Sequence, residues 1–197
     1  GVNGGGADSF LTLSLSDINI AGPVATSAVL APIALVRVDT QFSNDINGFN
    51  FRDIGTADSG ASMDISPMGV KVWMDRNGDG VIQPVTVFAP GSDFPPLYEG
   101  NYPSDGNFIS ANFTGPDLPV HLNPNQHKLF LITYTVNGSA TNGETFRIEF
   151  VNGPVPVLVG GSVQSLPNLP LSCALKTVTV PVPPPDVSVS QIPVPHN

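Results

Sequence analysis

The sequence is poor in cysteine and in charge. It contains one cysteine, Cys173, and only 12% of its residues are charged. A single cysteine excludes a disulfide within the chain and a zinc site built from several cysteines. We expect Cys173 to be a small buried apolar residue, with an intermolecular bridge or a reactive thiol as the alternatives. The sequence also lacks a run of about 20 apolar residues, so it predicts no membrane span.

Basic residues are scarce as well. The chain has seven Lys and Arg against 16 Asp and Glu, which gives a net charge of −9 and an isoelectric point near 4.4. The basic residues are scattered along the chain. Nucleic acid is therefore not an expected partner, because phosphate binding requires clustered Lys and Arg.

Helix signals are nearly absent, and alternation of apolar and polar residues takes their place. The alternation predicts strands over residues 9–18, 33–42, 68–74, 107–113, 128–136, 145–151, 175–182 and 186–194. The segment 128–136 is apolar on both faces, so we expect a central strand there. Asn-Gly pairs at 47–48, 77–78, 137–138, 142–143 and 152–153 predict tight turns. Together these signals predict an all-β fold, an antiparallel β-sandwich of about eight to ten strands, immunoglobulin-like or jelly-roll-like.

The ends of the chain differ in composition from its middle. Residues 1–8 form a Gly-rich segment that we expect to be a flexible tail, residues 9–182 a single sandwich domain, and residues 183–197 a Pro-rich tail with a short strand. The sequence begins "GVNGGG" without a methionine. This start predicts a processed chain whose leader has been removed, and hence an exported protein found outside the cell or on its surface.

The stretch "WMDRNGDGVI" (73–82) resembles the start of a calcium-binding loop. Asp75, Asn77 and Asp79 take alternating positions, and the carbonyl of Val81 falls two residues later. Position 12 of such a loop holds Thr86 instead of the usual glutamate, and the flanking residues predict strands. We therefore expect a structural calcium ion held in a β-turn, with a plain hairpin turn as the alternative. Further ligands would come from Asp53, Asp58 and Asp64.

A wider resemblance includes this turn. "MGVKVWMDRNGDGVI" and the later "LPVHLNPNQHKLFLITYTVNGSATNGETFRIEFV" resemble immunoglobulin- or fibronectin-like β domains of exported bacterial surface proteins. The resemblance covers roughly residues 10–151. It implies an extracellular, non-catalytic module that calcium often stiffens.

Catalytic motifs are missing from the sequence. The three histidines, His121, His127 and His196, show no zinc-hydrolase spacing. There is no nucleophile elbow, phosphate loop or dinucleotide fingerprint. We therefore do not expect an enzyme.

Aromatic residues suggest one alternative function. Trp73 lies beside the turn, and Phe94, Tyr98 and Tyr102 lie in a Pro-rich loop. Exposed aromatic rings could stack on sugars, which would make the chain a calcium-dependent carbohydrate- or cell-surface-binding module. The other interpretation is that this loop packs its aromatic rings onto the sandwich.

The first segment with clean alternation favours a different function. Leu11, Leu13 and Leu15 make an apolar face that could be inserted into another copy of the chain. Such strand exchange is head-to-tail and produces a filament or a surface layer of identical subunits. We expect an extracellular structural subunit of this kind, with copies of itself as partners and calcium as its stiffening ion. The alternative is that the strand pairs within its own domain.

Overall fold

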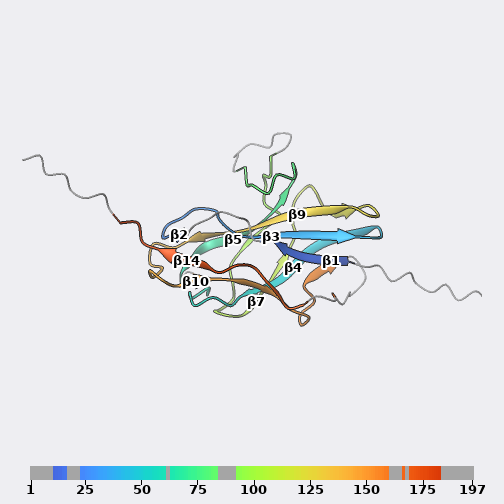
Figure 1. Ribbon diagram of the computed structural model, residues 1–197. Helices are drawn as coiled ribbons and strands as arrows, with labels where there is room; N and C mark the ends of the chain where they lie inside the picture. The colour runs from blue at the N-terminus through green and yellow to red at the C-terminus, as the bar shows by residue number, and fades with distance from the viewer. Residues whose placement is uncertain are drawn as a thin grey trace, which may run out of the picture.

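The chain folds into β-strands joined by turns and loops (Figure 1). The computed structural model describes residues 11–16 (backbone only), 23–60, 63–83, 92–159, 166 and 169–182, and this part contains no helix. The strands are β1 (Leu11–Ser16), β2 (Val24–Ala25), β3 (Ala31–Thr40), β4 (Asn44–Asp53), β5 (Ile65–Asp75), β6 (Tyr98–Gly100), β7 (Phe108–Asn112), β8 (Val120–Leu122), β9 (His127–Val136), β10 (Thr145–Phe146), β11 (Ile148–Phe150), β12 (Val157–Val159), β13 (Leu171–Ser172) and β14 (Lys176–Thr179).

The first sheet has the order β1-β3-β9-β5-β6, and each neighbouring pair is antiparallel. Strand β9 lies in its middle, between β3 and β5. This confirms the prediction of a central strand over 128–136, whose two apolar faces are both covered. The strands predicted over 33–42 and 68–74 are β3 and β5, so alternation located the main sheet well.

The second sheet is built around β4. Strands β11 and β12 pair with one edge of β4, and β7 and β8 pair with the other, while β13 extends the sheet beyond β11. A small third sheet has the order β10-β14-β2 and includes the parallel pair β14–β2. The predicted strand over 145–151 is divided into β10 and β11. The predicted strand over 186–194 lies outside the described residues.

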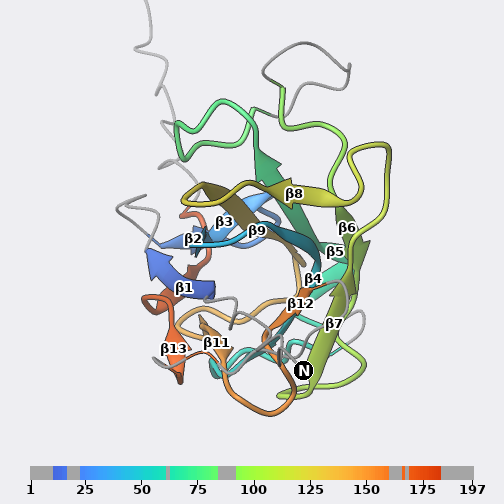
Figure 2. The same ribbon diagram turned by 90° about the vertical axis from the view of Figure 1, so that its right-hand side faces the viewer.

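Aromatic side chains join the two large sheets. Phe49 of β4 meets Phe130 of β9 edge to face, with ring centroids 5.0 Å apart, and also contacts Phe113 and Phe150. All four rings are buried. These ring contacts join strands of different sheets and form the core between them. The strands around this core, whose course can be followed in Figure 2, form an antiparallel β-sandwich, which confirms the predicted fold class.

Strand β4 corrects one prediction. The Asn47–Gly48 pair predicts a tight turn, but it lies inside the ten-residue strand β4. A Cβ atom on Gly48 would approach the backbone oxygen of Ala111 to 2.4 Å. Glycine is present because the β7 backbone comes very close there, and not because the chain turns.

No helix in the described part of the chain is long and apolar enough to cross a membrane.

Candidate functional site

The predicted calcium loop begins at the last residue of β5. The buried carboxylate of Asp75 accepts two backbone hydrogen bonds, from Gly78 N–H at 2.6 Å and from Gly80 N–H at 2.7 Å. Both glycines have positive φ angles, 76° and 73°. Residues with a side chain rarely adopt this conformation, so the two glycines allow the backbone to wrap around the carboxylate.

The exposed side of the turn is hydrogen-bonded too. Asn77 Oδ1 accepts from Asp79 N–H at 3.2 Å, and Asp79 Oδ1 accepts from Val81 N–H at 2.8 Å. The other oxygen of Asp79 accepts from the side-chain amides of Asn77 and Gln83. The hydrogen bond from Val81 is the main reason that the pKa of Asp79 lies below its usual value.

Residues that the sequence did not single out fix the base of this turn. The carboxylate of Asp93 is fully buried and accepts hydrogen bonds from Arg76 N–H at 3.0 Å and Gln83 N–H at 3.1 Å. The Arg76 guanidinium donates to the Ser92 carbonyl at 3.1 Å and forms an ion pair with Asp117. No local motif marks these residues, because their contacts join segments that are distant in sequence.

An open pocket of about 210 Å³ lies beside the turn. It is lined by Asp75, Arg76, Asn77, Gly78, His127, Lys128 and Leu129. The last three residues begin β9, which pairs with the end of β5. Basic side chains therefore border the carboxylate, so the pocket is not uniformly suited to a cation.

The turn fits a calcium ion only in part. Every side-chain oxygen of Asp75, Asn77 and Asp79 already accepts a hydrogen bond. One Asp79 oxygen accepts two, and each of the other oxygens keeps a second lone pair. Within the described residues there is no group of three or more His, Cys, Asp or Glu placed to hold a metal. Two carboxylates and one amide oxygen suit a weak site in which water supplies the remaining ligands.

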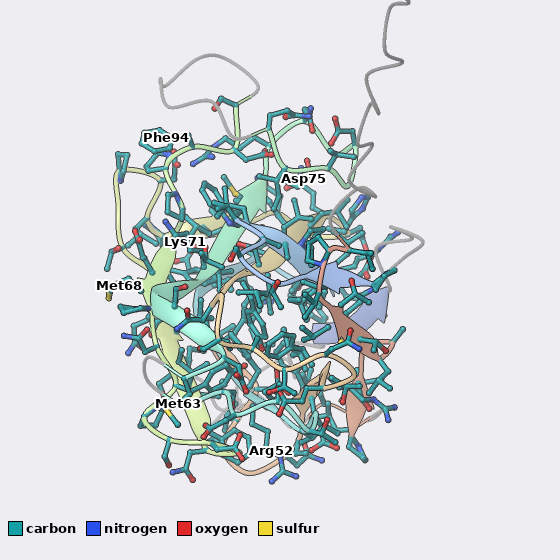
Figure 3. All side chains as sticks on the ribbon, turned by 90° about the vertical axis from the view of Figure 1, so that its left-hand side faces the viewer. Arg52, Met63, Met68, Lys71, Asp75 and Phe94 are labelled. Atoms are coloured by element: carbon teal, nitrogen blue, oxygen red, sulfur yellow. The ribbon has the colours of Figure 1, made fainter. Side chains whose placement is uncertain are left out.

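The other proposed ligands do not reach this turn. Asp64 precedes β5 and Asp75 ends it, and their ends of the strand pair with Val136 and Leu129 of β9. Seven residues of β9 separate those two positions, which corresponds to about 23 Å. Figure 3 shows Asp75 at one end of the molecule and Arg52 and Met63 at the other.

Asp53, Asp58 and Asp64 make contacts of their own at that far end. Asp53 accepts hydrogen bonds from the N–H groups of Gly55 and Arg147, and Asp58 N–H donates to Asp64 at 2.6 Å. The prediction that these three carboxylates complete the calcium site is therefore wrong, since a single ion cannot bridge the length of β5.

Trp73 is buried, contrary to its interpretation as an exposed sugar platform. Its side chain is 3% exposed and packs against Leu131 on the outer face of the first sheet. Its indole N–H donates to Thr133 Oγ1 at 2.9 Å. The outer face is covered by Leu30, Leu35, Ile82 and Phe94. Alternation correctly placed Trp73 opposite Val72, but the face that it occupies is not open to solvent.

Tyr102 is also buried, and the hydroxyl groups of Tyr102 and Tyr134 lie 2.7 Å apart. Burial raises the pKa of both phenols well above the usual value. Phe94 packs on the Trp73 cluster, and Tyr98 packs on the main core. The four aromatic residues therefore do not form one exposed platform, and the interpretation that this loop packs onto the sandwich is the correct one.

The strand-exchange segment lies at an edge of the first sheet. Strand β1 pairs antiparallel with β3 of the same chain, and Leu11, Leu13 and Leu15 stand opposite Thr40, Val38 and Val36. Val36 and Val38 are fully buried. In the single chain, β1 therefore pairs with β3 of its own domain.

Comparisons with known proteins give little further information. No model of a known protein family matches the sequence, and no curated protein matches it. The chain is similar to the solution structure of CaCohA2 from Clostridium acetobutylicum, with 19% identity over 86% of this chain and 90% of that chain and a TM-score of 0.32. Similarity at this level carries no functional information.

Proposed function

We propose that this chain is an extracellular structural module that assembles with copies of itself by exchanging strand β1 between neighbouring subunits. Assembly, and not turnover of a substrate, is then its main function. The ordered partner for β1 would be β3 of the next subunit, and the repeated head-to-tail contact would build a filament or a surface layer.

The position of β1 is the observation that supports this proposal. Among the described residues it is the first strand, it lies at a sheet edge, and it pairs with β3 over six residues from Leu11↔Thr40 to Ser16↔Leu35. If the strand of another copy took its place, the backbone hydrogen bonds would be the same. Exchange therefore requires no new interface, which is why swapping of an identical element costs little free energy. An unpaired β3 edge would instead be prone to aggregation.

A cross-linking experiment separates exchange from pairing within one chain. Ser14 and Arg37 are direct partners in the β1–β3 register. One protein carries Ser14→Cys and a second carries Arg37→Cys, both with Cys173→Ser. The two are mixed, unfolded, refolded together and oxidised. We expect a disulfide between the two chains, because opposite strand positions fall within disulfide distance.

A matched control uses Lys128→Cys, which lies on β9 and is not a partner of Ser14. It should give no specific cross-link with the Ser14→Cys chain.

Deletion of residues 1–16 should yield a non-assembling protein by light scattering and electron microscopy. Absence of the Ser14–Arg37 cross-link, or assembly of the truncated chain like the full chain, would contradict the proposal.

The proposal includes a calcium ion at the turn, held by Asp75, Asn77, Asp79 and the Val81 carbonyl, with water completing the shell. Its role would be to stiffen the end of β5. A site with two carboxylates should be weak, with a dissociation constant of roughly 10⁻⁴ to 10⁻³ M. At ten times that concentration, calcium would stabilise the fold by about 1.4 kcal/mol.

Calorimetric titration with calcium, and urea denaturation in calcium or chelator, test this part separately. The variant Asp79→Asn removes one exposed carboxylate and should abolish the effect. Asp105→Asn, at the opposite end of the molecule beside Ser59, should leave it unchanged. If neither heat nor a stability shift is observed for the unmodified chain, calcium has no part in the function.

A further inference from the structure

The pairing of β4 with β8 brings together a serine, a histidine and an aspartate. Asp45 of β4 lies directly opposite His121 of β8. Ser43 is two residues before Asp45, and residues two apart along an extended chain point to the same side. The result is a chain of hydrogen bonds: Ser43 Oγ lies 3.3 Å from His121 Nε2, and His121 Nδ1 lies 2.7 Å from Asp45 Oδ1.

The carboxylate of Asp45 determines how His121 can act. An ionised carboxylate only accepts hydrogen bonds, so His121 Nδ1 must carry the proton and donate to it. In the neutral imidazole the other nitrogen, Nε2, is then unprotonated. Nε2 can accept the hydrogen bond of the Ser43 hydroxyl, and it is the atom that would remove the hydroxyl proton.

The turn that carries Ser43 is held by side-chain hydrogen bonds. Thr40 is buried, and its Oγ1 accepts from Phe42 N–H at 3.2 Å and from Asn44 Nδ2 at 2.7 Å. Asn44 Nδ2 also donates to the Phe42 carbonyl at 3.1 Å. Ser43 lies between these residues, so its position relative to His121 is set before any ligand arrives.

The three residues are also accessible. The side chains of His121 and Asp45 are 49% and 43% exposed. An open pocket of about 250 Å³ lies on the same turn and is lined by Asp39, Thr40, Gln41, Asn125 and Gln126. Small molecules can therefore approach this end of the sandwich without any opening of the core.

We propose that Ser43, His121 and Asp45 form a nucleophilic triad that is acylated by small activated carboxylic esters and hydrolyses them slowly. Ser43 Oγ attacks the ester carbonyl carbon while His121 Nε2 takes its proton. The bond to the leaving oxygen breaks, and that oxygen takes the proton from His121, or it leaves as an anion while His121 passes the proton to solvent water. Water then attacks the acyl group and gives a proton to His121, the carboxylic acid is released, and Ser43 regains its hydrogen.

The test uses the full chain and p-nitrophenyl acetate. Release of nitrophenolate gives the rate, and mass spectrometry of the digested protein locates the acetyl group. We expect the acetyl group on Ser43. Ser43→Ala should reduce the rate to background, and His121→Gln should slow acetylation of Ser43 by roughly 10²-fold, the usual effect of a general base. The matched control is His127→Gln, an exposed histidine that should leave the rate unchanged.

Asp45 is a positioning residue. Its variants must therefore show whether a slower reaction comes from the lost orientation of His121 or from a less stable fold. Asp45→Asn removes the acceptor that fixes the tautomer of His121 and should slow acetylation at least tenfold, while Asp45→Glu should recover part of the rate. Urea denaturation should give equal stabilities for all variants, because the side chains are exposed. The proposal is overturned if acetyl is spread evenly over Ser43, Ser104 and Ser139, or if His121→Gln reacts as fast as the unmodified chain.

Discussion

Replacement of Asp93 by alanine should loosen the turn that follows β5. The Asp93 carboxylate is fully buried and accepts the N–H groups of Arg76 and Gln83 at 3.0 and 3.1 Å. A hydrogen bond to a charged acceptor contributes about 1.5–3 kcal/mol. Two such bonds, less the desolvation of one buried carboxylate, give a net loss of about 3 kcal/mol for Asp93→Ala. For a chain of 197 residues this corresponds to a melting temperature lower by about 9 °C.

Urea denaturation followed by circular dichroism measures this loss. Asp117→Ala is the matched control: it removes the ion-pair partner of Arg76, but Asp117 is 28% exposed. Its removal should cost about 1 kcal/mol or less. If Asp93→Ala loses no more stability than Asp117→Ala, then Asp93 does not hold the turn.

Three further substitutions test other parts of the fold by the same method. Gly48→Ala should lower the free energy of unfolding by about 2 kcal/mol or more, because its Cβ would lie 2.4 Å from a carbonyl oxygen of β7. Gly153→Ala, which has open space around it, should lower it far less. Burial raises the pKa of Asp53, so the folded protein holds a proton that the unfolded chain releases, and stability is lost as the pH rises above the ordinary value of 3.8. Relative to Asp53→Asn, the unmodified chain should therefore become more stable as the pH is lowered from about 7 toward 3.8, and a constant difference would contradict this. Trp73→Phe should lower the free energy of unfolding by about 2 kcal/mol, and adding Thr133→Val should recover part of this loss because both ends of one hydrogen bond are then removed. If the effects of the two substitutions simply add, the residues are not coupled.

Alternation of apolar and polar residues is sufficient to predict the strands of the main sheet, because the two-residue period of side-chain direction is a property of each strand by itself. The eight apolar or Thr positions of 129–136 could only be covered on both faces at a sheet centre, and β9 is found there. The prediction of a turn at Gly48 is wrong because the residue type alone is ambiguous. Glycine permits both a turn and a close backbone approach, and only the partner strand β7 distinguishes them.

The candidate sites depended on contacts that a linear sequence does not contain. Asp75 and Asp64 are close in sequence, yet β5 separates them in space. Ser43 and His121 are distant in sequence, yet the β4–β8 register joins them. Local spacing therefore predicted the turn and its glycines, while Asp93 and the Ser43 triad became visible only once the strands were paired.

Trp73 has one more consequence, because it is the only tryptophan in the chain. Its indole lies on the outer face of the first sheet, two residues before Asp75, and is packed with Ile82 and Phe94. Fluorescence excited at tryptophan wavelengths will therefore report one location in the molecule. It should respond to events at the turn and be nearly silent about the aromatic core and the β1 edge. A fluorescence transition that precedes the circular dichroism transition would show the turn opening before the sandwich unfolds.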